Sequence, residues 1–222
     1  IISTALARIM FAASGMMLAG TALGRIHQVM CAPELEIPDH PQKPKSSRVE
    51  FKDVTFRYDG AAADALSHVS FAVEPGETVA LVGPSGGGKT TAASLIPRFW
   101  DVTSGAVEVG GVNVSRMDPH ELMDQVAFVF QNSRLFKTSI LENVRAARPE
   151  ATRQQVMEAL EAAQCRDIIE KLPQGADTQI GSEGTYLSGG EAQRIALARA
   201  ILKDAPIVVL DEATAFMDPE NE

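Results

Sequence analysis

Two glycine-rich stretches carry the residues whose types and spacing suggest chemistry. The first, GPSGGGKTT, begins at Gly83 and follows a short apolar run, TVALV. It fits the pattern G-x-x-x-x-G-K-[ST], with Gly88, Lys89 and Thr90 at the defining places. Because strand-like run, loop, cation and hydroxyl follow one another in this order, a glycine-rich turn without a ligand is the weaker interpretation.

Each residue type in this loop has a chemical reason. Glycines reach positive φ angles and let backbone N–H groups approach phosphate oxygens that a side chain would block. Lys89 would bridge the β- and γ-phosphates of a nucleotide, and the Thr90 hydroxyl would bind Mg²⁺. The predicted phosphate loop comprises Gly83, Pro84, Ser85, Gly86, Gly87, Gly88, Lys89 and Thr90.

Two acids after another apolar run provide a partner for that metal. The run PIVVL ends at Asp211 and Glu212. Because Mg²⁺ takes oxygen ligands and keeps several waters, Asp211 would hold a metal-bound water. Glu212 would orient or deprotonate the attacking water. The alternative is that the two acids merely follow a strand and have no chemical role. The phosphate loop in the same chain makes this alternative weaker.

The second glycine-rich stretch, LSGGEAQRIALARA, opens a predicted helix. The Ser188 hydroxyl, the Gly189 and Gly190 amides and the helix N-terminus would form another anion-binding end. A local helix N-cap explains the same small residues equally well. One phosphate site needs only one such turn, so the second requires a further explanation.

The elements that would position these residues begin at Val49. VEFKDVTFRY alternates apolar and polar residues, and VSFAV, TVALV and QVAFVF are further strand-like runs. GAVEVGGVNV predicts a hairpin around Gly110 and Gly111. SILENVRAA and ATRQQVMEALEAAQCRDIIEKL instead have helical spacing. We expect an α/β domain with an inserted helical subdomain at about residues 132–188.

Two helix faces can be predicted from this spacing. Val156, Leu160 and Ala163 would lie on one face of the helical subdomain. The helix that follows, at residues 189–203, would turn four apolar residues inward, and PIVVL would return as a buried strand. Those four residues are Ile195, Ala198, Ile201 and Leu202.

The N-terminal part differs from the rest of the chain. Residues 1–24 hold a single charge, Arg8, in an apolar run that approaches the length of a membrane span. No signal peptide is recognisable, and we expect a piece of a longer chain. An arginine at the bilayer centre costs about 2.5–3.5 kcal/mol, which favours the end of a last transmembrane helix at residues 1–30 over a complete span. A buried helix of a soluble domain is the alternative. Prolines predict a linker at residues 31–48.

Composition bounds the function further. The 222 residues suffice for one sizeable domain with an appendage, and the formal net charge of −9 disfavours nucleic acid as a partner. The two cysteines, Cys31 and Cys165, lie far apart without metal-binding spacing, which is typical of free thiols in a reducing compartment.

Beyond these arguments, LSGGE followed by AQRIALARA resembles the signature motif of ATP-binding-cassette (ABC) ATPases. The resemblance covers residues 49–222, and it implies an ABC-type P-loop NTPase with a mixed-sheet core, an antiparallel β subdomain, and truncation at the C-terminus. In that family two cassettes bind ATP head to tail, so the second glycine turn serves the partner's ATP. It also implies roles for Tyr58 on adenine, Thr91 near the α-phosphate, Gln131 at Mg²⁺ and the attacking water, and Asp218 between the two sites.

Three features depart from the family pattern. Glu191 replaces the usual glutamine of the signature, which adds negative charge near the triphosphate that Ser188, Gly189, Gly190 and Glu191 would contact. The usual SALD reads AFMD, although its aspartate remains. The family's switch histidine has no match, and on that ground we expect nucleotide binding with little hydrolysis from this piece alone.

The junction GRIHQVMCAPELEIPD resembles that of exporter-fold (type IV) half-transporters, and EATAFMDPENE resembles the siderophore-related subgroup of yersiniabactin and mycobactin transporters. This implies an ATP-hydrolysing motor at the cytoplasmic side of the inner membrane, attached to its own transmembrane domain and paired with a second half-transporter. One alternative is a soluble ABC-type ATPase of DNA repair or chromosome organisation, but in those proteins long coiled coils separate the two motifs, and this chain has no such heptads. Another alternative is a non-catalytic regulatory cassette.

Overall fold

The computed structural model describes residues 2–31, 35–181 and 187–212 of the chain. The chain divides into two compact units, residues Ile1–Glu36 and Ile37–Glu222.

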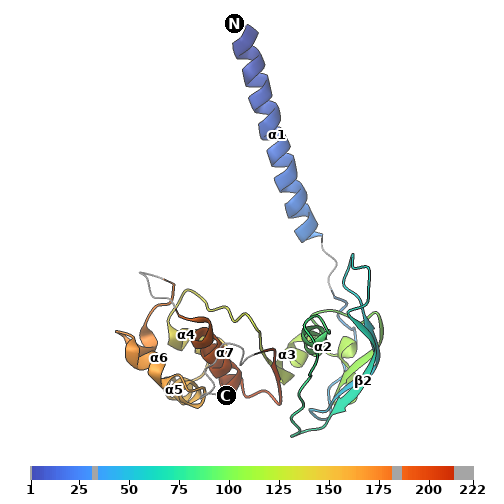
Figure 1. Ribbon diagram of the computed structural model, residues 1–222, viewed down its shortest axis with the longest axis vertical. Coiled ribbons are helices and arrows are strands. Elements are labelled where there is room, and N and C mark those ends of the chain that lie inside the picture. Colours follow the sequence, from blue (N-terminus) through green and yellow to red (C-terminus); the bar gives the residue numbers. More distant parts are fainter. Residues whose placement is uncertain (1, 32–34, 182–186, 213–222) are drawn as a thin grey trace. The chain divides into compact units, whose positions relative to one another are not determined.

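The first unit contains a single long helix, α1 (Ile2–Met30), drawn in blue in Figure 1. Its apolar side chains Met16, Met17, Leu18 and Leu23 are between 70% and 78% exposed. No helix in the described part of the chain combines the length and hydropathy that a membrane span requires. The assignment of residues 1–30 to the end of a transmembrane helix therefore stays a prediction.

The second unit begins with a segment outside any helix or strand, followed by a four-stranded antiparallel sheet in the order β2-β1-β3-β4. The described linker residues 35–48 form no helix or strand, as their prolines predict. The predicted hairpin is confirmed, since Gly110 and Gly111 turn the chain with φ angles of 57° and 80°. The strands are β1 (Val49–Phe56), β2 (Leu66–Val73), β3 (Ser104–Val109) and β4 (Val112–Asn113).

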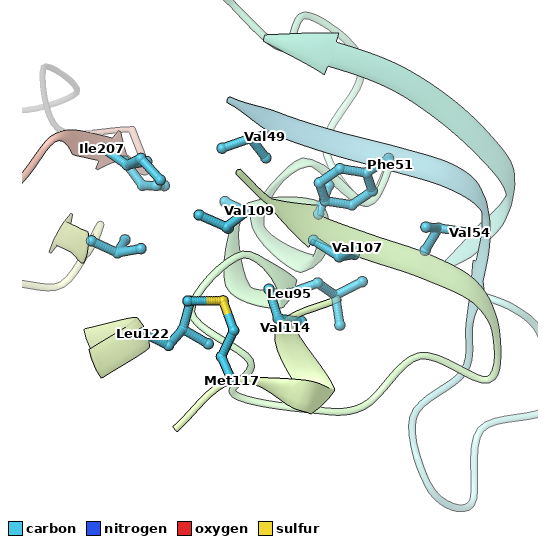
Figure 2. Close-up of a cluster of buried hydrophobic side chains, with 14 of the residues drawn as sticks. Val49, Phe51, Val54, Leu95, Val107, Val109, Val114, Met117, Leu122 and Ile207 are labelled. Atoms are coloured by element: carbon cyan, nitrogen blue, oxygen red, sulfur yellow. The ribbon is translucent and has the colours of Figure 1, made fainter. Parts of the chain in front are cut away.

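One face of this sheet forms the first core, as Figure 2 shows. Val49 and Phe51 of β1 and Val107 and Val109 of β3 are at most 3% exposed. They pack over Leu95 of the short helix α2 (Lys89–Leu95), which begins directly after the phosphate loop. The core is closed by the 3-10 turn η1 (Val114–Arg116) and the helix α3 (Pro119–Gln125). Burial of α2 against the sheet therefore fixes the loop that precedes it.

A two-stranded parallel sheet joins β5 (Val126–Val129) to β6 (Ile207–Leu210). Ile207 and Val209 of β6 face the first core, but Val208 and Leu210 are 55% and 52% exposed, so the prediction of a fully buried strand is wrong for its other face. Consecutive side chains of a strand point to opposite faces, and only one face of β6 is covered here.

The predicted strand TVALV is also wrong. Residues 78–82 have no strand pairing, and Val79, Leu81 and Val82 are 44%, 42% and 92% exposed. A strand needs a neighbour for its backbone N–H and C=O groups. Within the described residues β5 and β6 pair only with each other, so the apolar run has no ladder to join. The phosphate loop consequently follows a segment that is neither helix nor strand.

The predicted helical subdomain is present as a separate apolar cluster, whose helices gather around α7 in Figure 1. Val156, Leu160 and Ala163 are at most 2% exposed, as their spacing predicts. Thr152 caps α5 through a reciprocal capping box with Gln155. The elements are α4 (Ile140–Arg145), α5 (Arg153–Ala162), α6 (Arg166–Lys171) and the 3-10 turn η2 (Gly175–Asp177).

Helix α7 (Gly189–Lys203) connects this cluster to the strands, and its bounds match the prediction. One stripe, Ile195, Ala198 and Leu202, packs into the helical cluster, whereas Ala196 and Ala200 pack against β5. At 100° per residue, the two stripes point about 150° apart around the helix. The helix therefore buries two faces, whereas the sequence predicts only one. The prediction that Ile201 faces inward is wrong, because its side chain is 39% exposed.

Candidate functional site

The phosphate loop is a tight backbone turn closed by its own lysine. Gly86 and Gly88 have φ angles of 78° and 80°, which favour glycine. A Cβ atom on Gly88 would lie 2.5 Å from the Ala65 carbonyl oxygen, so a side chain has no room there. The Lys89 ammonium donates to the carbonyl oxygens of Gly83 and Pro84, each at 3.0 Å. The cation is thus already held over the loop that the sequence assigns to phosphate.

The loop is joined to the end of β6 by a single hydrogen bond between predicted metal-binding residues. The Thr90 hydroxyl donates to Asp211 Oδ1 at 2.8 Å. Asp211 is 7% exposed, and its backbone N–H donates to the Val129 carbonyl oxygen at 3.0 Å, which extends the β5–β6 ladder by one residue. Residues 121 positions apart in the sequence are thereby brought into direct contact.

The two residues assigned to the attacking water also meet. Gln131 Nε2 donates to Glu212 Oε2 at 2.5 Å. Gln131 follows β5 and Glu212 follows β6, so parallel pairing delivers both side chains to the same edge of the sheet. Glu212 has a φ of 47°, a left-handed conformation that costs a residue with a side chain about 1–2 kcal/mol. Such strain is commonly found at functional sites.

Tyr58 lies beside the phosphate loop. Its hydroxyl is 3.0 Å from the Thr91 hydroxyl, and either group can donate. The Tyr58 ring meets Trp100 edge to face at a centroid distance of 5.4 Å and Phe56 at 4.8 Å. Tyr58 is 36% exposed, so part of the ring remains accessible from solvent.

The second glycine stretch forms the N-terminus of α7. The Ser188 hydroxyl accepts from the Glu191 backbone N–H at 3.2 Å, and the Glu191 carboxylate accepts from the Ser188 backbone N–H at 2.8 Å. This capping box confirms that Ser188 is the N-cap of α7. Gly189 and Gly190 are the first two residues of the helix. The extra negative charge of Glu191 is therefore held on the cap itself.

The structure thus separates the predicted residues into two groups. Lys89, Thr90, Asp211, Gln131 and Glu212 lie in one connected region, with Tyr58 and Thr91 beside it. Within the described residues, no hydrogen bond or ion pair joins residues 188–191 to residues 83–91. Asp218 lies outside the described residues.

Gln193 is a residue that the sequence analysis missed. It is 1% exposed, and its side-chain Nε2 donates to the backbone oxygen of Glu212 at 3.1 Å and of Gln131 at 3.4 Å. The available signal was its position, because Gln193 precedes Ala196 and Ala200 by three and seven residues and so belongs to the buried stripe facing β5. A polar residue in a buried stripe indicates a specific partner.

Metal binding at this site depends on the oxygen ligands that the chain supplies. Among the described residues, no three His, Cys, Asp or Glu side chains form a cluster. Thr90 and Asp211 nevertheless place a hydroxyl and a carboxylate oxygen 2.8 Å apart. Mg²⁺ prefers such oxygen ligands and often takes only one or two from protein, with water and phosphate completing its shell. The residues present therefore fit Mg²⁺ together with a nucleotide.

The chain is similar to a known family of proteins. The family model described as ABC transporter matches residues 66–215. The chain is 49% identical over 178 residues to the ATP-dependent lipid A-core flippase of Vibrio cholerae, covering 80% of this chain and 31% of the flippase. It is 45% identical over 174 residues to a putative multidrug export ATP-binding/permease protein, YgaD, of Bacillus subtilis, covering 78% of this chain and 30% of that protein.

A solved structure, that of a bacterial Atm1-family ABC exporter with ATP bound, superposes with a TM-score of 0.82 at 36% identity. It covers 90% of this chain, which in turn covers 35% of the exporter chain. The chain therefore spans about a third of the length of these relatives.

Proposed function

The chain belongs to the ABC transporter family, and on that premise we propose that it is the ATP-binding and ATP-hydrolysing motor domain of an exporter-type half-transporter. The observation that carries the proposal is the pair of hydrogen bonds Thr90–Asp211 and Gln131–Glu212. These contacts unite the phosphate loop with the ends of two parallel strands, which is the arrangement that nucleotide hydrolysis requires.

Nucleotide binding would use the loop and the aromatic residue beside it. Backbone N–H groups of residues 85–91 would face the phosphates, and Lys89 would exchange its two carbonyl acceptors for phosphate oxygens. The exposed part of the Tyr58 ring would stack on adenine, a contact worth about 1–3 kcal/mol in base–aromatic stacking generally. Thr91, which already bonds the Tyr58 hydroxyl, would lie near the α-phosphate.

Hydrolysis would depend on Glu212 and Gln131. Glu212 would accept a proton from the attacking water, and the Gln131 amide, hydrogen-bonded to that carboxylate, would fix its direction. Thr90 and Asp211 would hold Mg²⁺, Asp211 through a bound water, and Gln131 would contact it. The metal, when bound, would neutralise the charge that develops on the transferred phosphoryl group.

The second glycine stretch supports a partner. Since Ser188, Gly189, Gly190 and Glu191 make no described contact with this chain's own phosphate loop, we assign them to the ATP of a second cassette, arranged head to tail. Asp218 would connect the two sites. Closure of the two cassettes on ATP and their release after hydrolysis would then drive the membrane domains.

The remaining assignments concern the membrane. We propose residues 1–30 as the end of the last transmembrane helix, 31–48 as a linker and 49–222 as the cassette, with the helical subdomain at about 132–188. The exposed Met16, Met17 and Leu18 of α1 support an apolar environment for that helix. The cassette would face the cytoplasm at the inner membrane. We retain the siderophore-related subgroup as a hypothesis about cargo, against the lipid and drug export named for the relatives.

The proposal is tested first by nucleotide binding to this chain. Trp100, the sole tryptophan, lies beside Tyr58 and should report ATP through its fluorescence. Lys89→Ala should weaken ATP binding by about tenfold to a hundredfold, since hydrogen bonds to charged groups contribute about 1.5–3 kcal/mol. Lys171→Ala, on the exposed surface of α6, is the matched control and should bind normally. An unaltered dissociation constant in the Lys89 variant would remove the phosphate-loop argument.

The partner arrangement requires the intact transporter. One copy carrying Lys89→Ala and another carrying Ser188→Arg would, when paired head to tail, leave one complete site and one doubly defective site. Differentially tagged copies should therefore occlude nucleotide in the mixed dimer but in neither parent dimer. A mixed dimer that occludes none would argue that each site is built within a single chain.

A further inference from the structure

Gln193 lies where three parts of the candidate site meet. It stands on α7, and its side-chain nitrogen donates to the Glu212 backbone oxygen at 3.1 Å and, more weakly, to the Gln131 backbone oxygen at 3.4 Å. Carbonyl oxygens only accept hydrogen bonds, so the amide nitrogen of Gln193 must face them. One side chain therefore connects the ends of β5 and β6 to a helix.

Packing alone does not account for a glutamine at this position. The residue is 1% exposed, and its Oε1 has no hydrogen-bond partner within the described part of the chain. A buried acceptor without a donor carries a desolvation penalty that a leucine or methionine of similar size would avoid. The two hydrogen bonds that Gln193 donates therefore explain its presence, because they offset this desolvation penalty.

Those bonds act on the backbone of the residues assigned to the attacking water. Glu212 is in a left-handed conformation, with φ at 47°, and its carboxylate is bonded to the Gln131 side chain. The bond from Gln193 holds the Glu212 carbonyl and so restrains the backbone on which that carboxylate is mounted. A small displacement of such a group is sufficient to slow a reaction strongly.

Gln193 also lies close to the second glycine stretch along α7. Gln193 is two residues beyond Glu191, which closes the cap of α7 on Ser188. The next residue, Arg194, binds Asp167 of α6 at 2.8 Å, so this turn of α7 is fixed to the helical subdomain as well. A displacement of the α7 N-terminus would therefore be transmitted to Glu212 and Gln131 through Gln193.

We propose that Gln193 is a positioning residue for hydrolysis: its amide holds Glu212 and Gln131 in register with the helix that carries the second glycine stretch. This inference rests on the proposed function. It extends that function by giving a physical route through which ATP bound at the second glycine stretch of a cassette affects hydrolysis at that cassette's own phosphate loop. A route of this kind requires evidence of energetic coupling, which the following experiment supplies.

The experiment uses the intact transporter in lipid with its partner and compares Gln193→Met with Gln193→Glu. Methionine keeps the volume and removes the donor, whereas glutamate keeps the shape and turns an oxygen toward the two carbonyls. We expect kcat for ATP to fall about tenfold or more in the Met variant and further in the Glu variant. The KM and the ATP dissociation constant should stay within about twofold, because neither hydrogen bond reaches the phosphate loop.

Stability separates positioning from packing. Methionine removes the unpaired Oε1 together with the two donated bonds, and these effects oppose each other, so the Met variant should unfold at a denaturant concentration close to that of the wild type while turning over more slowly. Gln174→Met, an exposed glutamine in the loop between α6 and η2, is the matched control and should leave kcat unchanged. In a Glu212→Gln background, Gln193→Met should cause little further loss, since both changes act on the same step.

Two results would overturn the inference. One is a Gln193→Met variant with the wild-type kcat, and the other is a parallel loss of stability, ATP affinity and kcat, which a purely structural residue gives. Failure of the proposed function is seen elsewhere, in a wild-type transporter whose ATP turnover does not depend on Glu212. If turnover depends on Glu212 but the Gln193→Met variant keeps the wild-type kcat, the result rejects only the role of Gln193.

Discussion

Gly88 offers a direct test of how the phosphate loop is packed. Its φ is 80°, and a Cβ atom would lie 2.5 Å from the Ala65 carbonyl oxygen and 2.7 Å from Leu66 Cδ2. Gly86 has nearly the same φ, 78°, but a Cβ atom there would meet nothing within 4 Å. Alanine at the two positions thus separates the cost of the backbone conformation from the cost of the collision.

The expected magnitudes follow from these two contributions. A left-handed conformation costs a residue with a side chain about 1–2 kcal/mol, which applies to both variants. Overpacking adds about 1–3 kcal/mol where rigid neighbours must move, and this applies only to Gly88→Ala, whose nearest neighbour is backbone. We therefore expect losses in the free energy of unfolding of about 1–2 kcal/mol for Gly86→Ala and about 2–5 kcal/mol for Gly88→Ala.

The assay is urea unfolding without nucleotide, followed by the fluorescence of Trp100 and by circular dichroism. Trp100 follows α2 closely in the chain, so its emission reports the region that the collision would disturb. Equal unfolding midpoints for the two variants would refute the reasoning, because the contact with Ala65 would then have no energetic consequence.

Two further predictions concern side chains beside and away from the loop. Tyr58→Phe removes only the hydrogen bond to Thr91 and should cost about 0.5–1.5 kcal/mol of stability while ATP still binds, as fluorescence titration can measure; a complete loss of binding would show that the ring is not the main contact. Burial raises the pKa of the Cys165 thiol to about 12, so at pH 8 a thiol reagent should label exposed Cys31 quickly and Cys165 only after unfolding. Two fast-reacting thiols in the folded chain would contradict that burial.

Local patterns in the sequence predicted local structure well. The alternation in VEFKDVTF gave β1, the paired glycines at 110 and 111 gave the hairpin, and the small residues at Ser188 and after it gave the start of α7. Each of these features depends on neighbours within a few residues. For the same reason the phosphate loop could be recognised from spacing alone.

Features that depend on distant partners were less predictable. The run at residues 78–82 has the composition of a strand, but pairing requires a neighbour that no local pattern specifies. Ile201 follows the apolar spacing of α7, yet that helix is buried on two faces and Ile201 lies on neither. Gln193 was missed because its role is defined by two carbonyls that parallel pairing of β5 and β6 brings beside it.

The signature position illustrates how structure refines a chemical expectation. Glutamate in place of glutamine at Glu191 suggested a weaker site for triphosphate because of its charge. The carboxylate instead closes the cap of its own helix through the Ser188 backbone N–H. A negative charge at a helix N-terminus also stabilises the helix, typically by about 0.3–1 kcal/mol. Glu191 thus has a structural role at the N-terminus of its own helix, independent of any bound nucleotide.

The role of Glu212 as the general base of this cassette is best tested by steady-state ATP turnover of the intact transporter in lipid. Glu212→Gln should slow turnover by about 10²–10⁴-fold while ATP binding is retained, because a general base is lost and the phosphate loop is untouched. Glu170→Gln, on the exposed surface of α6, is the matched control and should turn over normally. Unchanged turnover by the Glu212 variant would show that Glu212 is not the general base.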